Sequence, residues 1–87
     1  MNFEDIFVSS DDRYAIGVEK ASGRYYISMP VSNGIVDYEE YYELTPDQYR
    51  HFLDGRGAAI EFIDACRRRE RDHLLLQPPG SNRGTPV

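Results

Sequence analysis

Residues 24–44 read RYYISMPVSNGIVDYEEYYEL, with Asn33-Gly34 between two runs of aromatic and β-branched residues. A type I′ turn needs positive φ at both central positions, and Asn-Gly accepts this conformation readily. The stretch therefore predicts a β-hairpin with a two-residue loop, in which Val31 faces Val36 across the strands. In that register one face of the hairpin is mostly apolar, and the other carries tyrosines and acids.

The residues before this hairpin predict two more strands. Residues 3–8, FEDIFV, are a short apolar stretch typical of an edge strand, and residues 13–20 alternate between apolar and other side chains. The turn Ala21-Ser22-Gly23 joins the second strand to the third. Keeping the apolar faces together pairs Ile16 with Ile27, whereas a bulge in the turn shifts the pairing by one residue.

Two residues do not suit the predicted sheet. Pro30 lacks an amide donor, so its position faces away from a neighbouring strand or lies at a bulge. Strict alternation places Glu40 on the apolar face. Either a bulge turns Glu40 outward, or the strand extends past the core there, or Glu40 is a buried acid with a specific role.

Two helices follow the sheet. Thr45 has the properties of an N-cap, Pro46 of a first helical residue, and Gln48 completes a capping box. This first helix is short and ends at Gly55. A longer helix is expected over 58–72, with the run Arg67–Arg71 in its last turns, where cations meet the negative end of the helix dipole.

The fold class predicted from these elements is α+β. We expect an antiparallel meander of four or five strands, with one short and one longer C-terminal helix packed on its apolar face. Residues 1–77 form the single domain. Residues 78–87 are rich in proline and glycine and are expected to be a flexible tail.

Composition narrows the classes of function. The chain of 87 residues has a net charge of −5 and one cysteine, Cys66, so it has no internal disulfide, which indicates a reducing compartment. No apolar run approaches the roughly 18 residues of a membrane span. An acidic N-terminal region differs from a signal peptide, so a cytoplasmic protein is expected. An acidic domain also repels nucleic acid and favours basic partners.

The sequence has no motif for catalysis or for a cofactor. It contains no C-x-x-C, no H-x-x-x-H and no glycine-rich phosphate loop, and Cys66 lies on the expected buried stripe of a helix. We therefore expect no enzyme activity, no cofactor and no metal site. The alternative is a small enzyme or metal-binding domain centred on Glu39, Glu40 and His51.

The best candidate site is a protein-binding surface on the acidic face of the hairpin. Tyrosine provides a large contact area at low entropic cost, and carboxylates select a basic partner. Five acids and no base lie between Asp37 and Asp47. The candidate partner-binding residues are Tyr26, Asp37, Glu39, Tyr41, Glu43 and Asp47. A water-facing sheet with no partner is the alternative interpretation.

The hairpin YYISMPVSNGIVDYEEYYEL, the helical segment ending CRRRER and the short polar tail together resemble small acidic immunity proteins of bacterial toxin–immunity pairs. These include the immunity proteins of contact-dependent growth inhibition and related polymorphic toxin systems. The resemblance implies a cytoplasmic monomer that binds the C-terminal domain of a cognate toxin, such as a basic nuclease, in a 1:1 complex. The alternative to a monomer is a weak dimer formed through an exposed sheet edge. The alternative function is a non-catalytic adaptor or regulatory subunit that binds a basic housekeeping partner.

Overall fold

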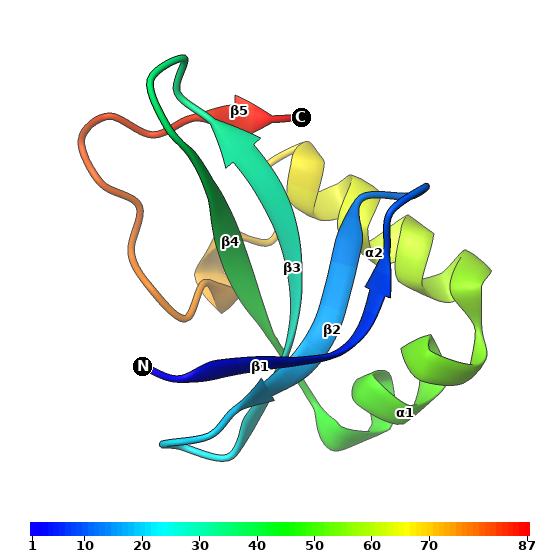
Figure 1. The fold of residues 1–87 in the computed structure, drawn as a ribbon. Helices are drawn as coiled ribbons and strands as arrows, with labels where there is room; N and C mark the ends of the chain where they lie inside the picture. Colours follow the sequence, from blue (N-terminus) through cyan, green and yellow to red (C-terminus); the bar gives the residue numbers. More distant parts are fainter.

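The computed structural model describes residues 1–87 and has the α+β architecture expected from the sequence (Figure 1). Four antiparallel strands form a meander in the order β1-β2-β3-β4, and the helices pack on one face of it. The elements are β1 (Phe3–Ser9), β2 (Tyr14–Glu19), β3 (Arg24–Ser32), β4 (Asp37–Leu44), α1 (Pro46–Asp54), α2 (Arg56–Arg67), the 3-10 turn η1 (Asp72–Leu74) and β5 (Thr85–Pro86).

The β3–β4 hairpin is present, but its predicted register is wrong by two residues. Val31 pairs with Tyr38 instead of Val36, and the loop comprises residues 33–36. The side chain of Asn33 explains the longer loop, because its Oδ1 accepts hydrogen bonds from the amides of Ile35 and Val36. A shift by two residues leaves the paired side chains of β3 and β4 on their predicted faces, whereas Val36 lies in the loop and is exposed.

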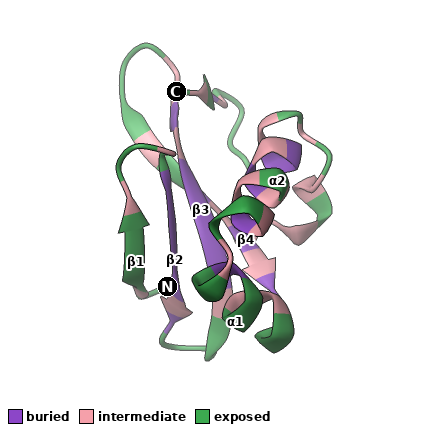
Figure 2. Ribbon diagram, turned by 90° about the vertical axis from the view of Figure 1, so that its right-hand side faces the viewer, coloured by how far each residue is buried: buried purple, intermediate pink, exposed green.

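The other strand predictions are confirmed, including the pairing of Ile16 with Ile27. β1 is an edge strand, and its ladder is interrupted at Ile6, which is left unpaired between Asp5 and Phe7. Figure 2 shows the consequence for burial: β2 and β3 are buried along most of their length, whereas β1 is largely exposed.

The hydrophobic core lies between the sheet and the two helices. Its buried members come from β2, β3, β4, α1 and α2: Tyr14, Ile16, Ile27, Met29, Val31, Tyr42, Leu44, Phe52, Ala59, Ile63 and Cys66. The predicted capping box starts α1, with Thr45 accepting from the Gln48 amide and Gln48 accepting from the Thr45 amide. Neither helix has the length and apolarity needed to cross a membrane.

The predicted end of the second helix is wrong. α2 ends at Arg67 and not near residue 72, because Arg69 adopts a positive φ of 64°. The amide of Arg69 donates to the carbonyl of Cys66, and the amide of Glu70 donates to the carbonyl of Ala65. These two bonds form a Schellman motif, the usual helix end, with arginine where glycine is the common residue. The arginine run therefore diverges and does not form a single helical face.

The residues after η1 return to the sheet. Leu75 forms a bridge with Tyr42, and the Leu76 amide donates to the carbonyl of Tyr41 at the edge of β4. Farther along, β5 pairs with residues Val31 and Ser32 of β3, beyond the end of β2. The contacts of the domain thus extend past residue 77, into the segment that the composition assigns to a flexible tail.

Candidate functional site: the outer face of the sheet

The outer face is the side of the sheet opposite the helices. Its side chains alternate along each strand with those that enter the core. The acids that the register places on it are Asp5 of β1, Glu19 of β2, and Asp37, Glu39 and Glu43 of β4. The structure therefore brings together three of the predicted site acids, Asp37, Glu39 and Glu43, on one strand.

The two tyrosines of the predicted binding surface, Tyr26 and Tyr41, are covered by β1. Tyr26 is fully buried, and its hydroxyl donates a hydrogen bond of 2.6 Å to Asp5 Oδ1. The ring of Phe3 stacks on Tyr41 at a centroid distance of 3.6 Å and meets Tyr26 edge-on. Tyr26 therefore stabilises the fold from within, and a partner cannot reach it in this conformation. Tyr41 is half-buried under Phe3.

Gly17 makes this covering possible. A Cβ atom at Gly17 would lie 2.1 Å from the carbonyl oxygen of Glu4 and 2.5 Å from the hydroxyl of Tyr26. The absence of a side chain lets β1 bend over β2 and bring Phe3 above β4. A small second core of aromatic rings results on the outer face.

An open pocket of about 410 Å³ lies beside this aromatic cluster. Asp5 and Glu39 are its acidic lining residues, Ala15 and Pro30 are apolar lining residues, and Arg13 also lines it. Although Glu39 is partly exposed to solvent, desolvation of its carboxylate raises its pKa and the charge of Asp5 raises it further, while the Ser28 hydroxyl and Arg13 oppose the effect. A cationic group entering this pocket would relieve that unfavourable environment.

The acids that line the outer face lack close cationic partners. Glu39 accepts only from the Ser28 hydroxyl at 3.2 Å, and Asp5 only from Tyr26. Asp37 is exposed and has no ion pair, and the Glu43–Arg24 pair is loose at 3.9 Å. Elsewhere most acids pair closely with an arginine or lysine: Glu4, Asp12, Glu40, Asp47, Asp64, Glu70 and Asp72.

Asp47 does not join this surface. It lies in the first turn of α1, which packs on the opposite face of the sheet, and its carboxylate pairs with Arg50. Two exposed apolar side chains lie at the tip of the β3–β4 hairpin, next in sequence to Asp37. Ile35 is 83% exposed and Val36 is 54% exposed. Exposed aliphatic side chains beside acids are suited to a protein contact.

The structure does not bring together Glu39, Glu40 and His51, the three residues of the catalytic alternative. Glu39 and Glu40 point to opposite faces of β4, and His51 is exposed on α1. Cys66 is buried, and burial raises the pKa of its thiol to about 12, which suppresses the reactive thiolate. No group of three or more histidine, cysteine or acidic side chains is arranged to hold a metal ion.

The sequence pattern of the hairpin does not indicate Asp5 or the pocket, but the residues of β1 and β2 carry a signal for both. Phe3 and Asp5 lie on the same face of β1, and two of the three β2 residues on that face, Ala15 and Gly17, are small. Small residues at consecutive positions of one face indicate that another chain segment packs closely there.

No family model, no curated protein and no solved structure matches this chain. The arrangement of its own side chains therefore carries the functional argument.

Proposed function

We propose that this protein is an immunity protein that binds a basic toxin domain through the outer face of its sheet and thereby neutralises it. One observation carries the proposal: the acids of the outer face, Asp5, Asp37 and Glu39, have no cationic partner within the chain, whereas most other acids do. Unpaired carboxylates on one surface attract a basic partner and accept charge-assisted hydrogen bonds from its arginines and lysines.

The pocket between Asp5 and Glu39 is the expected centre of the contact. It is large enough for one arginine or lysine side chain, and its apolar residues, such as Ala15 and Pro30, can contact the methylene groups of that side chain. Ile35 and Val36 at the hairpin tip supply apolar contact area at the side of it. Tyr26 contributes by fixing the position of Asp5, and does not make the direct contact with the partner that the sequence predicts.

The first experiment is a pull-down of the tagged protein from its native host, followed by mass spectrometry. A single stoichiometric basic protein, toxic when expressed alone and harmless beside this protein, is the expected result. Recovery of a basic housekeeping protein would contradict immunity and favour the adaptor. Recovery of an acidic partner would contradict the proposed surface as well.

A charge-matched pair of variants then tests the surface itself. The test variant carries Asp5→Asn, Asp37→Asn and Glu39→Gln, and the amides keep acceptor oxygens for Tyr26 and Ser28. The control carries Asp11→Asn, Asp54→Asn and Glu61→Gln, which change the net charge equally elsewhere on the surface. We expect slower association with the partner and a weaker salt dependence only for the test variant. Equal effects of both variants would indicate net charge alone.

A further inference from the structure

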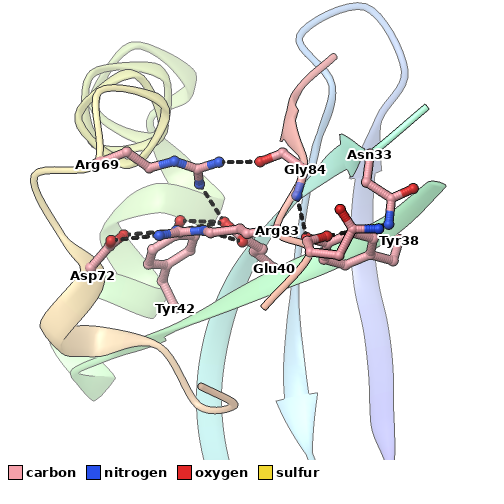
Figure 3. Close-up of polar contacts among 9 residues, drawn as sticks. Asn33, Tyr38, Glu40, Tyr42, Arg69, Asp72, Arg83 and Gly84 are labelled. Atoms are coloured by element: carbon pink, nitrogen blue, oxygen red, sulfur yellow. Dashed lines mark hydrogen bonds and ion pairs between the residues drawn. The ribbon is translucent and has the colours of Figure 1, made fainter. Parts of the chain in front are cut away.

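The segment formed by residues 83–87, here called the strap, crosses from η1 to the edge of β3. In Figure 3, Arg83 lies between Glu40 and Asp72, and Gly84 lies next to Tyr38. The Arg83 guanidinium donates to both carboxylates, at 2.8 and 3.0 Å to Glu40 and at 2.7 and 2.9 Å to Asp72. Both planar edges of this one side chain are therefore occupied by acids.

The next residues of the strap make backbone contacts. The Gly84 amide donates to the Tyr38 hydroxyl at 2.7 Å, and Arg69 donates to the Gly84 carbonyl at 2.7 Å. β5 then pairs with β3, and the Val87 amide donates to the carbonyl of Pro30. β5 thus occupies the part of the β3 edge that β2 does not reach.

These contacts require arginine at position 83 and glycine at position 84. A lysine in place of Arg83 could not bind two carboxylates through two planar edges. A side chain at position 84 does not fit, because a Cβ atom there would lie 2.5 Å from the carbonyl carbon and oxygen of Ser32. Glu40, Asp72 and the β3 edge together form a binding site for an arginine followed by glycine and an extended segment.

The strap contributes almost nothing to the hydrophobic core. The core and the apolar residues packed against it end at Leu75, and residues 77–82, which connect to the strap, are exposed. The contacts that hold the strap are the hydrogen bonds and ion pairs above, together with the bond from Arg13 to the Val87 carbonyl, and no strap side chain belongs to the hydrophobic core. Release of the strap therefore costs less free energy than global unfolding.

We propose that the strap is an intramolecular ligand, which leaves its site as a unit and admits an arginine-glycine segment of a protein partner by strand addition. Strand addition to a sheet edge uses main-chain hydrogen bonds for affinity and side-chain pockets for selectivity. The Glu40–Asp72 pair provides the pocket for arginine, and the restricted space beside Ser32 selects glycine. The tethered strap competes with the partner's segment through its high local concentration.

Opening is tested by amide hydrogen exchange of the full chain, with Gly84→Ala as the variant. Gly80→Ala is the matched control, since no atom lies within 4 Å of a Cβ added at Gly80. In the unsubstituted protein, the Gly84 and Val87 amides should exchange at least tenfold faster than core amides of β2 and β3. Gly84→Ala should speed exchange at Val87 by a further factor of ten or more and leave the core amides unchanged.

Binding is tested on the Gly84→Ala protein with the synthetic heptapeptide SNRGTPV, which has the sequence of residues 81–87. Addition of the peptide at millimolar concentration should shift the NMR amide signals of Val31 and Ser32. Peptides carrying Arg83→Lys or Gly84→Ala should shift them at least fivefold less. Arg83→Ala, which removes the clamp without adding an atom, serves as a second open protein if Gly84→Ala does not fold.

Three results would overturn the proposal. Strap amides that exchange together with the core amides would show that the strap leaves only on global unfolding. Strap amides without any protection in the unsubstituted protein would show that the site is never occupied. Equal shifts with all three peptides would show that the site does not select arginine and glycine.

Discussion

Glu40 and Arg83 form an ion pair of 2.8 Å between a strand residue that is 5% exposed and an arginine 43 residues later in the sequence. Arg69 reaches the same carboxylate at 2.5 Å, and the Tyr42 hydroxyl donates to it at 3.0 Å (Figure 3). Burial alone raises the pKa of Glu40, but these donors outweigh it and lower the pKa below its ordinary value. Glu40 is therefore the buried acid with a specific role, one of the three alternatives open in the sequence.

Glu40→Gln should lower the free energy of unfolding by roughly 3 kcal/mol, because both arginines lose the charge that compensates their partial burial. Urea unfolding followed by circular dichroism measures the change. Glu70→Gln is the control, since Glu70 pairs with Arg68 on the surface, and it should leave the midpoint unchanged. Equal midpoints for Glu40→Gln and the unsubstituted protein would refute a stabilising role for this network.

The backbone of Arg69 provides a second prediction. Its φ of 64° is unfavourable for a residue with a Cβ atom, and its guanidinium contacts Glu40. Arg69→Ala and Arg69→Gly both remove the contact, but only glycine accepts the conformation without strain. The glycine variant should be more stable than the alanine variant by about 1 kcal/mol, measured by urea unfolding. An alanine variant of equal or greater stability would show that position 69 is not held in this conformation.

The bend of β1 gives the third prediction. Gly17→Ala places a methyl group against the Glu4 carbonyl and Tyr26, and should cost about 1–3 kcal/mol of stability. Gly57→Ala is the contrasting change, because position 57 lies in α2 with nothing within 4 Å of an added Cβ. It should stabilise the protein by about 0.5 kcal/mol through helix propensity. Thermal unfolding should move in opposite directions for the two variants, and a shared direction would contradict the packing at Gly17.

The parts of the fold that the sequence predicts are determined by contacts between residues close together in the chain. The alternation of side chains in residues 24–44 predicts both faces of the hairpin, and the capping box at Thr45 predicts the start of α1. The hydrogen bonds of the Asn33 side chain lengthen the loop by two residues. Because side chains alternate with a period of two along a strand, this shift keeps the paired residues on their predicted faces. Local sequence patterns are sufficient wherever neighbours in the chain make the deciding contacts.

The parts of the fold that the sequence does not predict depend on contacts between residues far apart in the chain. The partners of Glu40 lie 29 and 43 residues away, so no pattern near Glu40 indicates that its charge is compensated. The covering of Tyr26 depends on the bend of β1, which follows from contacts made through Gly17. The tyrosines of the candidate site were therefore expected to be exposed, although its acids, apart from Asp47, lie where the alternation places them.

The fourth prediction concerns acid stability and depends on Glu19. This buried carboxylate accepts hydrogen bonds from the amides of Asn2, Ala21 and Ser22 and from the Ser22 hydroxyl, which lower its pKa from 4.5 to about 2. The unfolded chain takes up the proton first as pH falls. The stabilisation from Glu19 is therefore complete above pH 4.5 and is lost between pH 4.5 and about 2.

Glu19→Gln should accordingly lower the thermal midpoint at pH 7 and reduce its dependence on pH between 4.5 and 2. Glu39→Gln is the contrasting variant, because the pKa of Glu39 is raised and its protonation on acidification stabilises the folded state. Its midpoint should fall more steeply with acidification than that of the unsubstituted protein. Thermal scans followed by circular dichroism from pH 7 to pH 2 measure both slopes. A Glu19→Gln protein with the unchanged slope would show that its hydrogen bonds do not hold the charged form.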